Sequence, residues 1–206
     1  MKSLFNLALL TSIAAAILVT LVSAPYVELT MAMLLVALVF LAKNDDNSQL
    51  LTLCFAIVLV LTAVAAYLFK TFILHSTNSY FLQNTYAFSI NLSLSLLLLF
   101  LLKHRMTIAV ILTKGKSASI FEKNYAEGPL YLLVLILVFV DFMALMENFL
   151  RNLDRVGVSE ETAKVFWDVT FFYDYFEYLK AVPLLLCITL LYVGLVVRTK
   201  RQPIQN

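Results

Sequence analysis

The 206 residues are 62% hydrophobic and only 14% charged, whereas soluble domains average about 45–50% apolar and about 25% charged residues. This composition argues against a soluble domain and favours a multi-pass membrane protein. The net charge of +2 and the lack of a basic stripe with interleaved aromatic residues argue against a nucleic-acid partner.

Residues 4–22 form an apolar run that predicts an uncleaved first transmembrane helix. The alternative is a secretory signal cleaved after Val22-Ser23-Ala24, although this run exceeds the usual length of about 7–15 residues and Pro25 would follow the cleavage site. Residues 26–42 predict a short second span. A polar turn at 43–48 separates it from a third span at 50–69, which is long enough to cross the bilayer.

A fourth span is predicted at 80–102, after a polar connection at 70–79. Within it, Asn84, Asn91 and Ser95 recur at i, i+7 and i+11 and therefore share one helical face. Such a polar face is typical of hydrogen bonding to a neighbouring helix; the alternative is that it binds a ligand.

The long basic connection at 103–128 contains an apolar stretch, 106–113, that is too short to span. We expect this stretch to be interfacial or an extension of the fourth helix. A fifth span is predicted at 130–151 and a sixth at 167–198. The sixth helix is expected to begin as early as Ser159, a suitable N-cap, and to kink at Pro183.

Six spans place both termini on one side of the membrane. With the N-terminus inside, ten of the fifteen Lys and Arg residues are cytoplasmic, which favours an N-in/C-in topology. The sequence thus predicts an all-α integral membrane protein, with residues 1–206 as a single bundle of about six transmembrane helices. We expect it in a bacterial inner membrane.

The last two predicted spans carry charged side chains where hydrocarbon is expected, namely Asp141, Glu147, Asp174, Glu177 and Lys180. A charge at the bilayer centre costs at least about 2.5–3.5 kcal/mol on insertion scales, so it normally faces a partner, a cavity or water. Counting the rise per residue in antiparallel helices gives two of them a similar depth. We therefore predict that Asp141 and Lys180 form an ion pair.

Two interpretations of these charges remain open. Converging carboxylates can share a proton or hold a cation through oxygen ligands. Alternatively, Glu147–Arg151 and Glu177–Lys180 are structural ion pairs near the membrane surface. The aromatic residues at 166–178 similarly predict either an interfacial belt or a pocket for a lipid or an aromatic compound.

No nucleophile, metal-ligand or phosphate-binding motif is present in the sequence. We therefore expect a non-enzymatic protein without cofactor or metal, acting in the lipid bilayer as a subunit or partner of a larger membrane assembly. Its partners are expected to be other membrane subunits or further copies of itself. The alternative is a small transporter or an ion- or proton-conducting protein that uses the acidic residues of the last two helices.

Overall fold

The computed structural model describes residues 24–77, 79–113 and 124–201. All the secondary structure in these ranges is helical. The principal helices are α2 (Ala24–Leu41), α3 (Asp46–Leu68), α5 (Tyr80–Lys103), α6 (Arg105–Thr113), α7 (Glu127–Arg151) and α10 (Phe176–Arg201). Shorter helical segments are η1 (Ala42–Asn44), η2 (Phe69–Ile73), α4 (Leu74–Ser76), η4 (Leu153–Val156), α8 (Glu160–Lys164) and α9 (Phe171–Asp174).

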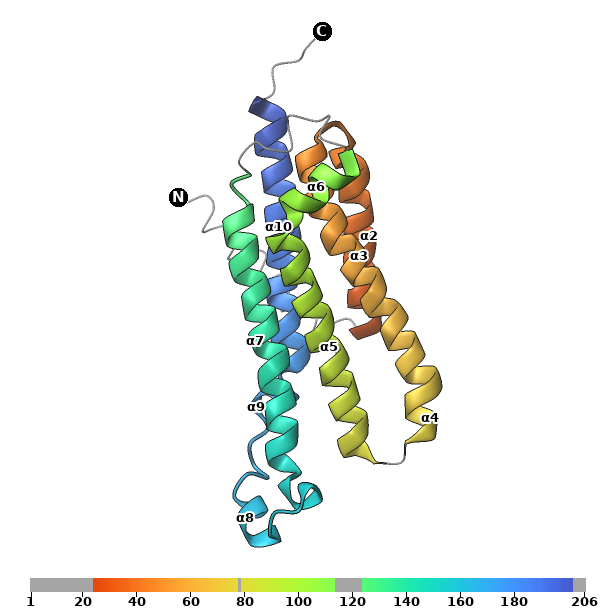
Figure 1. Cartoon of the computed structure of the whole chain (residues 1–206), viewed down its shortest axis with the longest axis vertical. Coiled ribbons are helices and arrows are strands. Elements are labelled where there is room, and N and C mark those ends of the chain that lie inside the picture. The colour runs from red at the N-terminus through yellow and green to blue at the C-terminus, as the bar shows by residue number, and fades with distance from the viewer. Residues whose placement is uncertain (1–23, 78, 114–123, 202–206) are drawn as a thin grey trace.

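The long helices form an antiparallel bundle (Figure 1). Each packs against the next in the order α2, α3, α5, α7 and α10, and α10 also contacts α2 and α3. Buried apolar residues fill the half of the bundle where α2 packs, among them Leu35, Phe55, Leu130, Cys187 and Leu191. The far half of α3 diverges from this core and ends beside the start of α5 (Figure 1).

Four of these helices are long and apolar enough to cross a membrane: Asp46–Ser76, Tyr80–Lys103, Glu127–Arg151 and Phe176–Thr199. A further apolar stretch, Thr30–Asn44, is shorter. The span predicted at 4–22 lies outside the described residues. The chain is therefore a helical bundle with the dimensions of a membrane protein.

Both predicted boundaries of the third span were wrong. The third span begins at Asp46 rather than at residue 50, because its acidic first turn suits a helix N-terminus. It then continues through a π-helical turn to Ser76, so most of the expected polar connection at 70–79 is helical. The stretch at 106–113 belongs to a separate helix, α6, after a break at His104, so of the two expected alternatives it is not a continuous extension of the fourth helix.

The sixth predicted helix is also shorter than expected. Residues 160–174 form two short helices joined by turns, and α10 begins only at Phe176. The predicted N-cap, Ser159, precedes the five-residue α8 instead. Tertiary contacts described below hold the intervening segment away from a continuous helix.

Proline and glycine occupy positions that suit their backbone chemistry. Pro129 lies in the first turn of α7, where its missing N–H removes no helical hydrogen bond. Pro183 lies inside α10, which continues past it. A Cβ on Gly194 would come within 3.0 Å of the Ala126 Cβ atom, so glycine allows α10 to approach the start of α7 closely.

Candidate functional site

The predicted ion pair between α7 and α10 is present. The Lys180 Nζ atom lies 3.0 Å from Oδ1 of Asp141, whose side chain is fully buried, while the Lys180 side chain remains 24% exposed. The approach to Oδ1 does not meet the angular requirements of a hydrogen bond, so this contact is electrostatic. The pairing offsets the cost of placing either charge alone in an apolar environment.

Helix α5 completes the surroundings of this pair through two residues of the predicted polar face. The Ser95 hydroxyl donates a hydrogen bond to Oδ2 of Asp141. Lys180 donates to Oδ1 of Asn91 at 2.8 Å. The third residue of the face, Asn84, is half-buried and has no part in these contacts. The polar face therefore serves an ion pair on two neighbouring helices.

A cavity of about 240 Å³ lies next to Lys180. All five helices of the bundle contribute to its walls, which are mainly apolar and include Met31, Phe55 and Leu137. Asn91, Ser95, Lys180 and Glu177 add polar atoms. We call this feature the charged cavity.

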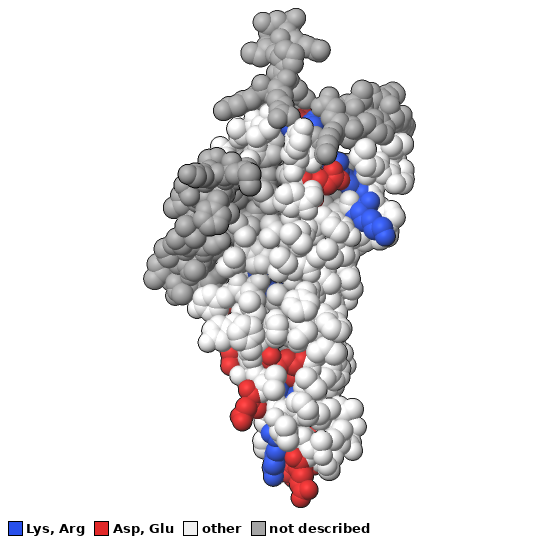
Figure 2. All heavy atoms as spheres, turned by 90° about the vertical axis from the view of Figure 1, so that its left-hand side faces the viewer, with Lys and Arg blue, Asp and Glu red and all other residues white. Residues whose placement is uncertain are grey.

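The other acidic residues predicted for the site are dispersed. Glu177 and Asp174 are both exposed. Glu177, one helical turn from Lys180, lines the charged cavity, whereas Asp174 does not. Figure 2 shows acidic side chains gathered toward the end of the molecule that carries α8, while the middle of the same face is almost uncharged.

Glu147 has a local structural role. Its side chain is buried, and its two carboxylate oxygens accept hydrogen bonds from the backbone N–H groups of Phe172 and Tyr173, both at 2.8 Å. It therefore anchors the first turn of α9 to α7, which is why a continuous helix does not begin at Ser159.

The ion pairs proposed for the structural interpretation do not form. Glu147 bonds to backbone groups, and the Arg151 guanidinium lies over the Tyr173 ring at 4.9 Å. Lys180 pairs with Asp141 rather than with Glu177. Reasoning from i, i+3 and i, i+4 spacing failed here because contacts between helices outcompete neighbours on one helix.

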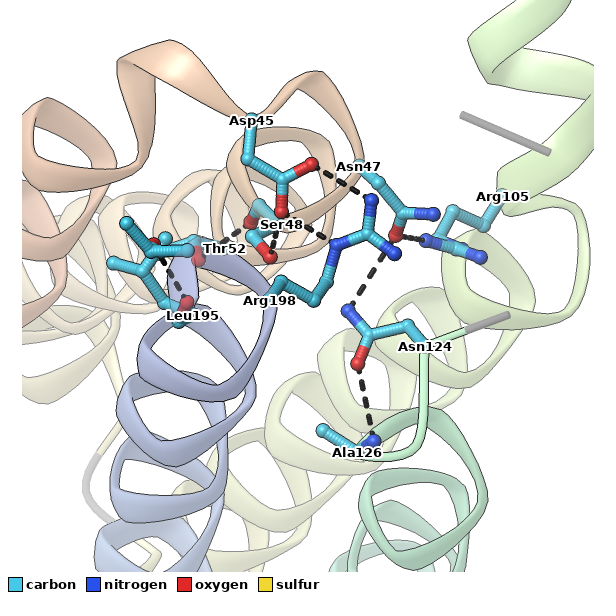
Figure 3. Close-up of polar contacts among 10 residues, drawn as sticks. Asp45, Asn47, Ser48, Thr52, Arg105, Asn124, Ala126, Leu195 and Arg198 are labelled. Carbon is cyan, nitrogen blue, oxygen red and sulfur yellow. Dashed lines mark hydrogen bonds and ion pairs between the residues drawn. The ribbon is translucent and has the colours of Figure 1, made fainter. Parts of the chain in front are cut away.

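A second buried polar group, which we call the arginine cluster, lies at the opposite end of α10 (Figure 3). Arg198 donates to both carboxylate oxygens of Asp45, from Nε at 2.6 Å and from Nη2 at 3.0 Å. The Ser48 hydroxyl also donates to Asp45, at 2.6 Å. Asp45 and Arg198 are 3% and 7% exposed. Such a bidentate ion pair is among the strongest interactions that arginine makes with a carboxylate.

Arg105 extends the arginine cluster to two further helices. Its guanidinium donates to Oδ1 of Asn47 and, at 2.9 Å, to Oε2 of Glu127. Asn124 donates to the same Asn47 oxygen at 3.4 Å, and its own oxygen accepts the backbone N–H of Ala126 at 3.1 Å (Figure 3). The cluster thus ties the start of α3, the start of α6, the start of α7 and the end of α10 together.

Sequence reasoning did not identify the arginine cluster. Asp45, Asn47 and Ser48 were assigned to a polar turn, and Arg105 and Arg198 served only to orient the chain. A partial signal was present, since Arg198 directly follows a long apolar run and a buried acidic partner is one of the two ways to satisfy such a residue.

Electrostatics at Asp45 favour its ionised form. Burial by itself raises the pKa of this carboxyl, but the hydrogen bonds from Arg198 and Ser48 and the charge of Arg198 outweigh burial. The pKa of Asp45 is consequently lowered below its ordinary value. The pair with Arg198 is therefore fully ionised at neutral pH.

The fold and the site together define a bundle of helices, four of them long and apolar enough to cross a membrane, with a buried ion pair beside a cavity. No family model, curated protein or solved structure matches the chain. Among the described residues, no group of His, Cys, Asp and Glu side chains has the arrangement of a metal site.

Proposed function

We propose that this chain is a small membrane transporter that moves a proton or a small solute through the charged cavity. The observation that supports this proposal is the Asp141–Lys180 pair, which lies at the wall of a cavity formed by five helices. Ionisable residues inside a membrane bundle are costly and commonly mark transport pathways. The Lys180 side chain is partly exposed, so this pair can exchange partners in a way that a sealed core pair cannot.

In the proposed mechanism the ion pair is the point of coupling. A proton that reaches Asp141 removes its charge and releases Lys180 to another acceptor. Beyond the pair, buried Cys187, Ile188 and Leu191 separate the cavity from the arginine cluster. Lys180 and Arg198 are 18 positions apart on α10, or about 27 Å along the helix axis. A solute can pass this buried apolar segment only if the helices move. We therefore propose an alternating-access carrier rather than an open channel.

A flux measurement tests this proposal directly. Purified protein in liposomes with an imposed pH gradient is expected to transport protons, and Asp141→Asn is expected to reduce the rate by at least about tenfold because the coupling charge is removed. Asp174→Asn is the matched control, since it neutralises an exposed acid outside the cavity. Equal rates in protein-free and protein-containing liposomes would contradict proton transport.

The proposed orientation is N-in/C-in, in a bacterial inner membrane, with the arginine cluster on the cytoplasmic side. Cysteines placed at exposed Ser159 and Lys43 are then expected to react from opposite sides. An impermeant maleimide added to intact cells should label Ser159→Cys and leave Lys43→Cys unmodified. The native Cys54 and Cys187 are buried and serve as the unreactive background. Labelling of Lys43→Cys from outside would reverse the topology.

The second candidate function is that of a non-enzymatic subunit of a larger membrane assembly. It is supported by the far half of α3, where large apolar residues such as Val60, Val64 and Tyr67 are 53%, 48% and 69% exposed. An apolar helix face of this kind suits contact with lipid or with a partner helix. Co-purification of a stoichiometric membrane protein from native membranes, lost on Val64→Arg, would favour this function over transport.

A further inference from the structure

The size of the charged cavity limits what it can hold. An engineered apolar cavity of about 150 Å³ accommodates benzene, which has six non-hydrogen atoms. By simple proportion, the cavity of about 240 Å³ suits a molecule of roughly ten non-hydrogen atoms. Its mainly apolar walls favour an apolar or aromatic body on that molecule.

The hydroxyl groups of the cavity, and one N–H of the Asn91 amide, donate to protein acceptors. Thr62 donates to the Val58 carbonyl at 2.9 Å, and the Asn91 amide donates to the Ala87 carbonyl at 3.0 Å. Ser95 donates to the ion pair. The Asn91 oxygen already accepts from Lys180, whereas the Thr62 and Ser95 hydroxyl oxygens keep a lone pair for a further donor. These two acceptors favour a ligand that brings its own hydrogen-bond donors.

The balance of charge points to a cationic ligand. The charge of Lys180 is offset by Asp141 at 3.0 Å, and Lys180 is further engaged by Asn91 and by the Phe176 ring, 5.2 Å from its nitrogen. Glu177 also lines the cavity, and within the described residues its carboxylate has no ion-pair partner. The residues around the cavity therefore carry one net negative charge, which an anionic ligand would oppose.

We propose that the charged cavity binds a small amphipathic monocation, a protonated amine with an apolar or aromatic body of roughly ten non-hydrogen atoms. The ammonium group donates hydrogen bonds to the Glu177 carboxylate, and the body lies against Phe55, Phe176 and the neighbouring aliphatic side chains. This inference rests on the proposed function, for which it names the class of the transported solute.

Three probes with the same nine-carbon phenylpropyl skeleton and different terminal groups test the charge argument. Phenylpropylamine, phenylpropanol and phenylpropionate are titrated by calorimetry against the purified full chain in the same detergent micelles, with empty micelles subtracted. The amine is expected to bind tightest and the carboxylate weakest. Tighter binding of the carboxylate than of the amine would overturn the proposal.

A substitution locates the binding site. Glu177→Gln is expected to weaken amine binding by about tenfold, the cost of losing one charged hydrogen bond, and to leave binding of the alcohol unchanged. Asp174→Asn is the control, because that carboxylate is exposed like Glu177 but does not line the cavity. Equal amine affinities in the wild type and in Glu177→Gln would overturn the assignment of the ammonium to Glu177.

The binding and flux measurements test the amine site and the transport function separately. Amine binding that depends on Glu177, in a protein that transports neither protons nor amine in liposomes, supports the amine site and contradicts the transport function. Proton flux that depends on Asp141, in a protein without amine affinity, contradicts the amine site alone.

Discussion

Lys180→Met is expected to destabilise the protein by about 3–5 kcal/mol, because it leaves the fully buried Asp141 carboxylate without its cation. Asp141→Asn is expected to cost less, since the Lys180 side chain that remains is 24% exposed and keeps its bond to Asn91. The double variant should therefore cost less than the sum of the two single changes. The measurement is a double-mutant cycle on unfolding in detergent. Additive costs would mean that the pair contributes no coupling energy.

Arg198→Met is expected to have an effect of similar size, about 3–5 kcal/mol at neutral pH, because Asp45 then stays buried without its two-pronged partner. Lys43→Met removes a nearby exposed charge and should change the free energy of unfolding by no more than about 0.5 kcal/mol. Thermal unfolding in detergent measures both. An equal effect of the two substitutions would show that the arginine cluster does not hold the helix ends together.

The cost of Arg198→Met should also depend on pH. The pKa of Asp45 is lowered in the folded protein, so the pair with Arg198 contributes its full stability above the ordinary aspartate pKa of about 3.9 and loses it as the pH falls through the lower folded value. In Arg198→Met the burial of Asp45 is no longer outweighed by the arginine, so its pKa rises in the variant. The difference in unfolding free energy between wild type and Arg198→Met should therefore be largest near pH 7 and shrink as the pH falls, beginning above about pH 4. A difference that grows with acid would contradict this assignment.

The four long apolar helices were predictable because a segment that crosses hydrocarbon has to be long and apolar. The predicted count of six spans is not confirmed, since four helices of the described residues are long and apolar enough. The meeting of Asp141 and Lys180 was predictable from depth alone. The deviations arose where one side chain reaches across to another helix. Glu147 accepts hydrogen bonds from the backbone N–H groups of Phe172 and Tyr173, and the last helix is shorter than predicted. The sequence pattern of residues 160–175 does not indicate this contact, because Glu147 lies 25 positions before Phe172.

The arginine cluster was missed for a related reason. Spacing along the chain indicates which residues share a face of one helix. The arginine cluster instead joins residues far apart in the sequence, such as Asp45 and Arg198, which are 153 positions apart. Basic residues at the ends of apolar runs have two physical roles, contact with lipid headgroups and burial against an acid. Only the packing of α10 beside the start of α3 distinguishes between them.

Pro183 has a mechanical consequence for α10. A proline has no N–H, so the carbonyl of Leu179, directly before Lys180, lacks the donor that the helix would normally supply four residues later. Bending at this point therefore costs no helical hydrogen bond between residues 179 and 183. The segment from Cys187 to Arg198 packs in the core and is held by the arginine cluster. Pro183 therefore divides α10 into two segments that are held differently. The later one is fixed by the core and the arginine cluster, whereas the earlier one, with Glu177 and Lys180, is tied to its neighbours mainly through the contacts of Lys180 with Asp141 and Asn91.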